Sequence, residues 1–348
     1  MKYIKQAAGL ILSAILCASI VSCNENPETE ELLPIVDRNA ILSQAGTFGI
    51  VTPQSIGNAI YYPSADGGIT VMTHQNGAWK SDRVLDDAFV LHMAALGDEL
   101  ICGIAEGDGL AWSVYDIGAE TLTPLTIPET SAAAEALDDA SGICILEGGL
   151  YVMHSYWQGI SRIDLTTWDC VTFDAETWGN HVLCSADETS FYVPMPNQIE
   201  VFDRADSEKS IYDWSEHENW PEGAKITGAY LTENDRMYLH ISREDAMVPE
   251  EIKRAVWYVD TKGDWSQPTV LATLGELAAY SVTRLCGEYG GTLVLTDGDK
   301  LYAYDTESDK LAELCAFPQN GVICAGGYVL TQTDNGMEVV AEIPATVS

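Results

Sequence analysis

Short runs in which apolar and polar residues alternate recur along this chain. In LYAYDTESDKLAEL, Leu301–Leu314, one such run ends at an Asp, a polar turn follows, and a second run begins. Side chains of a β-strand point to opposite faces in turn, so this pattern predicts two antiparallel strands joined by a turn. The same phrase recurs with its Asp at Asp116, Asp164, Asp203 and Asp260. Each of these carboxylates is expected to accept hydrogen bonds from the amides of its turn.

The phrase belongs to a longer repeat. Its Asp recurs at intervals of 39 to 57 residues, and the longest interval contains a charged insertion, Ser242–Arg254. Two further strand-like runs precede each phrase, with Gly, Asp and Asn at the joints, so each unit is predicted to contain four short antiparallel strands. A period of this length is typical of a repeat architecture.

Two weaker units flank these five, at Phe48–Leu85 and at Gly321–Ile343. The first strand of the upstream unit is expected at Phe48–Pro53. The downstream unit shows only three strand-like runs, whereas the run Ile35–Leu42 has no unit of its own. We expect Ile35–Leu42 to supply the missing strand, so that a ring of units closes between N- and C-terminal strands.

Seven four-stranded units without a helical period resemble an all-β fold, the β-propeller of the WD40-like or quinoprotein-like type. The resemblance covers residues 35–348 and rests on the repeat alone. The chain lacks the Gly-His and Trp-Asp signature of WD40 repeats, the tryptophan docking motif of quinone-dependent dehydrogenases and the Asp-boxes of sialidases. Because the first and last units are the faintest, six or eight blades remain open.

The first residues have the features of a secretory signal. Lys2 and Lys5 precede a short apolar run, which ends at Ile20–Cys23. This sequence resembles a bacterial lipobox, with Cys23 as the residue that receives the lipid. We therefore expect a lipoprotein signal peptide at 1–22, an acidic flexible tether at 23–34 and one propeller domain at 35–348. The chain resembles bacterial outer-membrane lipoproteins, and its acidic tether resembles the surface-export signal of some of them.

The charge of the chain narrows its partners. Asp and Glu outnumber Lys and Arg by 53 to 17, for a formal net charge of −36. Nucleic-acid binding requires cationic surfaces, so this balance argues against it and favours solubility instead. No cysteine belongs to a C-x-x-C pair, and most lie in apolar runs, so they are expected to be small core residues.

No specific catalytic, metal or cofactor motif occurs in the sequence. The Asp-Gly and Asn-Gly pairs, such as those in TDGD and TDNG, are expected to be hairpin turns rather than calcium loops. His92, His181 and His240 fall in or beside predicted inner strands, where a histidine is more often a hydrogen-bonded core residue than a metal ligand. We therefore assign no catalytic residue, no metal ligand and no cofactor.

The loops that interrupt the repeat carry the candidate binding residues. Loops on a rigid scaffold commonly bind ligands, and aromatic rings beside polar groups suit the faces and hydroxyls of sugars. The alternative is that these rings pack between neighbouring blades. The loops of the third to fifth units supply the predicted ligand contacts Tyr156, Trp157, Trp178, His181, Trp220, Arg243 and Arg254.

Together these features indicate a non-enzymatic, lipid-anchored binding protein of the cell envelope. It would capture a glycan or another nutrient ligand, or dock a partner protein such as an outer-membrane uptake complex. Two alternatives stay open. One is a propeller glycosidase or polysaccharide lyase, which predicts paired carboxylates in the central channel. The other is a protein-binding scaffold of envelope assembly.

Overall fold

A computed structural model gives the fold of the chain. It divides into two units, residues 1–36 and 37–348. The residues that the structure describes lie in the second unit: 39–43, 52–107, 109–146, 148–154, 159–174, 181–186, 189–205, 207–217, 220, 223–242, 254–266, 268–271 and 284–347. The predicted signal peptide, the tether and Cys23 lie outside these ranges and stay predictions.

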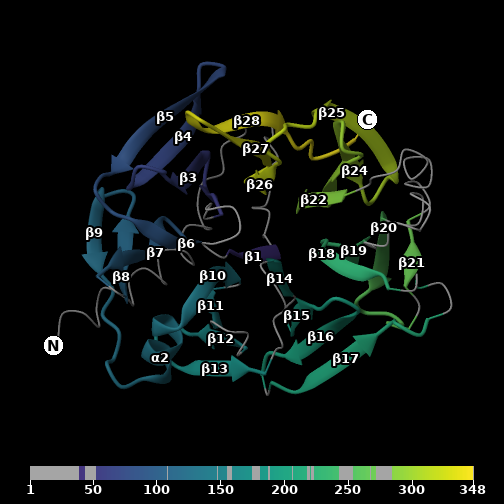
Figure 1. Ribbon diagram of the computed structural model, residues 1–348, viewed down its shortest axis with the longest axis horizontal. Helices are drawn as coiled ribbons and strands as arrows, with labels where there is room; N and C mark the ends of the chain where they lie inside the picture. Colours follow the sequence, from purple (N-terminus) through teal and green to yellow (C-terminus); the bar gives the residue numbers. More distant parts are fainter. Residues whose placement is uncertain are drawn as a thin grey trace, which may run out of the picture. The chain divides into compact units, whose positions relative to one another are not determined.

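Seven antiparallel sheets form the second unit, and they stand around a common centre as the blades of a propeller (Figure 1). This confirms the predicted fold and blade number. Blades 1 to 3 consist of β2 (Gln54–Ile56), β3 (Ala59–Pro63), β4 (Ile69–Gln75) and β5 (Ala78–Leu85); β6 (Val90–Leu96), β7 (Glu99–Glu106), β8 (Gly109–Asp116) and β9 (Thr121–Pro124); and β10 (Ala140–Leu146), β11 (Gly149–His154), β12 (Ile160–Ile163) and β13 (Cys170–Phe173).

The remaining blades follow in chain order. Blades 4 to 7 consist of β14 (His181–Ala186), β15 (Ser190–Pro194), β16 (Gln198–Asp203) and β17 (Lys209–Asp213); β18 (Lys225–Leu231), β19 (Arg236–Ser242), β20 (Arg254–Asp260) and β21 (Thr269–Val270); β22 (Arg284–Tyr289), β23 (Thr292–Thr296), β24 (Lys300–Asp305) and β25 (Lys310–Ala316); and β26 (Ile323–Ala325), β27 (Tyr328–Thr333) and β28 (Gly336–Glu342). The described part of the chain contains one helix, α2 (Ala132–Asp138), which is too short to cross a membrane.

The strand order gives the ring two distinct faces. In each set of strands given above, the first strand lies on the inner side and the last lies outside (Figure 1). Connections from the first to the second strand and from the third to the fourth therefore share one face, which we call the turn face. Connections from the second to the third strand, and from each blade to the next, share the opposite face, which we call the loop face.

Tight turns on the turn face follow from their residues. Asn76–Gly77, Gly290–Gly291 and Gly326–Gly327 each have positive φ at both central positions, between 54° and 81°. This is the backbone of a type I′ turn, whose twist matches that of paired strands, and Gly and Asn adopt it at the lowest cost. The hairpin turns predicted at TDGD and TDNG are confirmed on the loop face, where they join β23 to β24 and β27 to β28.

The repeated Asp holds the outer hairpin of five blades, as predicted. One carboxylate oxygen accepts the backbone N–H of a residue two or three positions later, at 2.7–3.1 Å. The pKa of Asp164 lies below its usual value because the N–H groups of Thr167 and Thr166 donate to it. The five acceptors are Asp116, Asp164, Asp203, Asp260 and Asp305.

Apolar side chains of adjacent blades interlock to form the core. One cluster joins Met93 and Tyr115 of blade 2 to Tyr61 of blade 1. Another joins Tyr192 of blade 4 to Met237 of blade 5. Cys102 and Cys144 are buried, as expected for small core residues, and no disulfide joins the cysteine side chains that the structure describes. Burial of these apolar surfaces holds the blades together.

The predicted fourth strand of blade 7 is wrong. The run Ile35–Leu42 contributes to β1 (Asn39–Ser43), which pairs antiparallel with β14 and makes blade 4 five-stranded, while blade 7 keeps three strands. Apolar residues stand opposite one another in this pairing, as in Ile41↔Leu183 and Leu42↔Val182. Since β14 is the first strand of its blade, β1 lies on the inner side of blade 4 (Figure 1).

The ring closes between blade 7 and blade 1 through side chains rather than through a shared strand. Tyr62 and Met72 of blade 1 cluster with Leu330 and Met337 of blade 7. The first described strand of blade 1, β2, begins at Gln54, and most of the run predicted at Phe48–Pro53 lies outside the described residues. The closure between the two ends of the repeat is therefore confirmed, but by packing.

Candidate functional site

A histidine at the loop-face end of blade 3 lies within a connected group of polar side chains. His154 is the last residue of β11, and its Nε2 lies 2.7 Å from Ser161 Oγ on β12. Ser161 Oγ lies 2.8 Å from Thr172 Oγ1 on β13. On its other side, His154 Nδ1 lies 3.6 Å from Asp139 Oδ2. A chain of polar groups thus crosses three strands of one blade and fixes the imidazole ring.

Local sequence explains why these groups meet. Ser131 caps α2 by accepting the N–H of Ala134 at 3.1 Å, and the helix buries Ala133, Ala136 and Leu137 against blades 2 and 3. Asp139 follows directly at the C-cap, which places its carboxylate beside β11. The short helix therefore positions Asp139 next to His154.

The loop after His154 is closed by one backbone hydrogen bond. The N–H of His154 donates to Gly159 O at 3.1 Å across residues 155–158. Gly159 has φ of 113°, a backbone region that essentially only glycine adopts. This closure fixes both ends of the segment that contains the predicted contacts Tyr156 and Trp157.

The order Asp139, His154, Ser161 resembles the carboxylate, base and hydroxyl of a nucleophilic triad. However, Ser161 is 0% exposed, and its hydroxyl also contacts Thr172. A nucleophile must reach its substrate, so this geometry suits a network that holds His154 in place rather than one that attacks a substrate.

A second irregular loop, residues 214–224, joins blade 4 to blade 5. It is anchored by the N–H of Trp214, which donates to Asn197 O at 3.3 Å, and by successive turns at His217 and Trp220. Trp220 is 7% exposed and packs against Trp214 and Trp257, with ring centroids 5.9 and 5.6 Å away. Trp220 therefore packs between blades, which was the alternative to ligand contact.

The other predicted contacts are only partly described. The backbone of His181 begins β14 and that of Arg254 begins β20, so both residues lie at loop-face ends of adjacent blades. Tyr156, Trp157, Trp178 and Arg243 lie outside the described residues and stay predictions.

Histidines near the centre have structural surroundings. His92 is 4% exposed and stacks on Trp112, with ring centroids 5.9 Å apart and planes at 14°. Burial lowers the pKa of His92 to about 4, so the ring is neutral at physiological pH. His240 is equally buried. Within the described ranges, no group of three His, Cys, Asp or Glu side chains could hold a metal ion.

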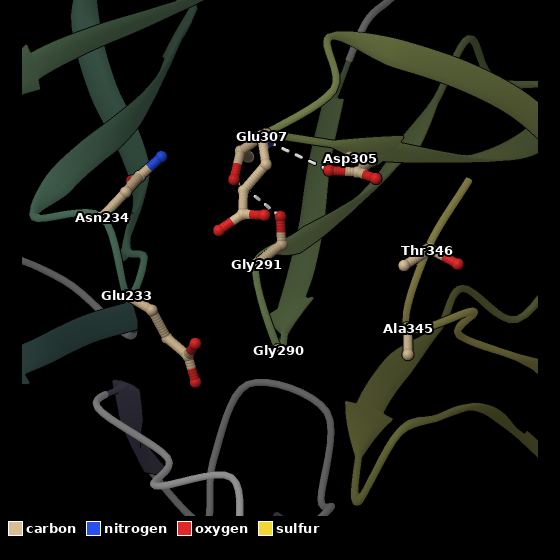
Figure 2. A pocket seen from close by; sticks show the side chains of 9 residues that line it. Glu233, Asn234, Gly290, Gly291, Asp305, Glu307, Ala345 and Thr346 are labelled. Carbon is tan, nitrogen blue, oxygen red and sulfur yellow. Dashed lines mark hydrogen bonds between the residues drawn. The ribbon is translucent and has the colours of Figure 1, made fainter. Parts of the chain in front are cut away.

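The turn face has a small polar cavity between blades 5 and 6. Figure 2 shows the Glu233–Asn234 turn on one side, the Gly290–Gly291 and Asp305–Glu307 turns on another, and Ala345 and Thr346 of the C-terminal tail opposite. Its volume of about 50 Å³ accommodates a few water molecules, whereas pockets for small-molecule ligands have about 300 Å³ or more.

This cavity is a seam that the C-terminal tail closes. Asp305 Oδ1 accepts the N–H groups of Glu307 and Ser308, and Oδ2 accepts that of Val347 at 3.4 Å. Thr292 Oγ1 donates to Pro344 O at 3.0 Å. Burial raises the pKa of Asp305, but these donors outweigh it and keep the pKa below its usual value. Asp305 thus ties the tail to blade 6.

Sequence reasoning found the loop that contains Tyr156 and Trp157, but it missed the polar network around His154 at the start of that loop. The pairing Val152↔Ser161 places Ser161 beside His154, and this register follows from the hairpin alone. Asp139, in contrast, directly follows helix α2 in the chain, and the repeat pattern did not predict this helix. Its proximity depends on how α2 packs, which the local pattern does not contain.

Comparisons with known proteins support the fold and no particular activity. No protein-family profile matches the chain, and no curated protein matches its sequence. The structure is similar to that of "YCF48 bound to D1 peptide", with TM-score 0.54, 9% identity and coverage of 89% of this chain and 99% of that one.

Two further solved structures share the architecture. The oligogalacturonate lyase of Vibrio parahaemolyticus has TM-score 0.54 and 9% identity over 89% of this chain and 98% of its own. PorZ of Porphyromonas gingivalis, a bacterial surface component of a type-IX secretion system, has TM-score 0.51 and 13% identity over 89% of this chain but only 40% of its own. Similarity at these identities concerns the fold: this chain is a β-propeller.

Proposed function

We propose that this chain is a lipid-anchored, non-enzymatic binding protein of the bacterial outer membrane, which captures a glycan on the loop face of blades 3 to 5. The observation that carries the proposal is the contrast between the faces. Long connections on the loop face separate β9 from β10, β17 from β18 and β19 from β20, at 125–139, 214–224 and 243–253. Long loops on a rigid ring are where recognition residues concentrate.

The chemistry of these loops favours a sugar ligand. Asp139 and Ser161 hold His154 at the loop-face end of blade 3, and Tyr156 and Trp157 follow shortly after it in the chain. Aromatic faces stack on the apolar faces of sugar rings, while imidazole and carboxylate groups bond the hydroxyls. Trp178, His181, Arg243 and Arg254 extend the proposed surface across blades 4 and 5. Trp220 is left out because it is buried.

Solved propellers support this range of ligands. One neighbour is named as bound to a peptide, and another as a lyase of an oligogalacturonate. A third is named as a bacterial surface component. A protein or peptide ligand is the competing outcome of the binding experiment, and an outer-membrane uptake complex is the partner that the envelope location suggests.

The binding test is calorimetry on glycans first selected with a glycan array. Trp157→Ala and Trp178→Ala are expected to weaken binding about ten-fold or more, since about 1.4 kcal/mol corresponds to a factor of ten. Trp168→Ala is the matched control, because Trp168 lies in the turn-face hairpin between β12 and β13. Unchanged affinity in both loop variants, or an equal loss in the control, would contradict the proposal.

Two observations address the remaining parts of the proposal. Cys23→Ser is expected to move the chain from the membrane fraction to the soluble fraction of the cell, since the lipid is its proposed anchor.

Mass spectrometry of the bound glycan is expected to show the glycan intact after prolonged incubation, because the proposed function is binding without catalysis. Shortened products would replace the binder with the alternative, a glycosidase or lyase.

A further inference from the structure

The position of β1 fixes where the N-terminal chain leaves the propeller. The last residues of β14 pair with β15 next to the turn that joins them, as Ser185↔Tyr192 and Ala186↔Phe191. That turn connects a first strand to a second, so it lies on the turn face. In β1, Asn39 pairs with Ser185 and Ser43 pairs with His181. The strand β1 therefore begins at the turn face and ends at the loop face.

From this path we infer that the turn face is the surface that faces the membrane, and that the loop face points away from it. The inference rests on the proposed lipid anchor at Cys23. The chain must reach Asn39 from the turn face, on the inner side of the ring beside β14 and β10. The tether thus joins the propeller near the centre of the turn face.

The length of the tether enforces this orientation. About 15 residues separate Cys23 from Asn39, which span at most about 50 Å when fully extended and about 20 Å on average as a flexible coil. A unit of this size has a radius of gyration of about 20 Å. To turn the loop face to the membrane, the tether would have to run from the centre to the rim and then along the full strand length, about 20 Å more. That path nearly exhausts the tether, so the loss of chain entropy opposes it.

The pairing of β1 decides which face is attached. The strand β2 begins at Gln54 and runs toward the turn at Gly57, so Gln54 lies at the loop-face end of blade 1. If β1 left β14, the chain would be held first at the loop face, by a longer tether. Docking of β1 therefore reverses the side from which the anchor emerges, and it leaves the proposed glycan surface free to face outward.

Why β14 accepts β1 follows partly from its own blade. Continuing the register from Ser185↔Tyr192 would place Pro194 and Pro196 opposite Leu183 and His181. Proline has no N–H to donate, and β15 ends at Pro194. Among the described residues, β15 pairs with Ser185 and Ala186 of β14, whereas the start of β14 is held in the sheet by β1 on its inner edge.

Energy transfer to the membrane tests the orientation. Asp299 and Glu307 are exposed and flank β24, Asp299 on the loop face and Glu307 on the turn face. A fluorophore is placed at either site through a bio-orthogonal amino acid, and the full-length lipidated chain is reconstituted in vesicles with acceptor-labelled lipid. The two sites are separated by about 20 Å, so transfer is expected to be several-fold stronger from position 307. Equal transfer, or stronger transfer from position 299, would overturn the inference.

Two further experiments test the lipid anchor and the orientation separately. Flotation of wild type but not of Cys23→Ser reports lipid attachment alone. A chain that begins at residue 23, held by an N-terminal His tag on nickel-chelating lipid, reports orientation even if no lipid is attached in cells. If that chain shows no difference between positions 299 and 307, the orientation inference fails independently of the anchor.

A cross-link tests the role of β1 itself. Ala40 pairs with Cys184, so Ala40→Cys is expected to form a disulfide with it on oxidation, and Ala40→Cys with Cys184→Ser is the control.

Ile41→Pro should release β1 from β14 and abolish the difference in energy transfer between positions 299 and 307. If Ile41→Pro leaves that difference intact, β1 does not set the orientation.

Discussion

The two faces of this propeller differ in what their polar residues do. On the turn face, Asp116, Asp164 and Asp305 accept backbone N–H groups and hold hairpins, so their carboxylates serve the fold. On the loop face, His154 is held by Asp139 and Ser161 at the edge of an aromatic loop. The comparison teaches that regular, repeated polar residues are structural here, whereas function is to be sought where the repeat is interrupted.

The largest expected effect on stability comes from replacing the buried Trp214, and the same substitution at Trp157 provides the contrast. Trp214 is 2% exposed, donates to Trp265 O at 2.6 Å and stacks on Trp265 with planes at 6°. Trp214→Ala should lower the free energy of unfolding by about 3–5 kcal/mol in urea titrations. Trp157→Ala should change it by less than about 0.5 kcal/mol while losing ligand. A large loss of stability in Trp157→Ala would make that loop residue part of the core.

The buried His92 makes a prediction about pH. Its pKa of about 4 in the folded chain lies below the ordinary value of 6.5, so the unfolded chain binds this proton first as the pH falls. Wild type should therefore lose up to about 3 kcal/mol of stability between pH 6.5 and pH 4 relative to His92→Leu. Urea titrations across this range check it, and parallel pH curves for the two chains would contradict it.

Asp305 and Asp116 occupy equivalent positions in the repeat, but Asp305 is buried whereas Asp116 is partly exposed. Asp305 is 8% exposed and accepts three backbone N–H groups, and Asp116 accepts that of Ala119. Asp305→Ala should cost about 2 kcal/mol of unfolding free energy, and Asp116→Ala about 1 kcal/mol or less.

The pH dependence of this effect has the same sign as that of His92, because both groups have a lowered pKa in the folded chain. The folded pKa of Asp305 is lowered, so its contribution is present above the ordinary carboxyl pKa and is lost as the pH falls through the lowered value. The difference between wild type and Asp305→Ala should therefore shrink in acid. Equal costs for Asp305→Ala and Asp116→Ala at neutral pH would show that the tail adds nothing.

The smallest expected effect concerns Ser161. Since its side chain is fully buried, a fluorophosphonate probe should leave it unlabelled, and Ser161→Ala should change the binding of ligand only slightly. Intact-mass spectrometry reads the labelling. A covalent adduct on Ser161 would show that the loop face carries a nucleophile and would shift the comparison toward catalysis.

The sequence predicts the ring and its turns well because both depend on local chemistry. Period-two alternation and an Asp before each turn are sufficient to place the hairpins at Asp164 and Asp305. The destination of β1 was mispredicted because strand pairing across the ring depends on long-range register, which the run Ile35–Leu42 does not encode by itself. Asp139 was missed for a similar reason, since tertiary packing of α2 brings it to His154.

Photo-cross-linking in cells tests the central claim most directly, because it captures a ligand whatever its chemical identity. Glu208 and Glu216 are exposed and flank β17, Glu208 on the turn face and Glu216 on the loop face. With a photoreactive amino acid at either position, we predict covalent capture of an envelope glycan or partner from position 216 and none from position 208. Capture from position 208 alone would contradict the assignment of recognition to the loop face.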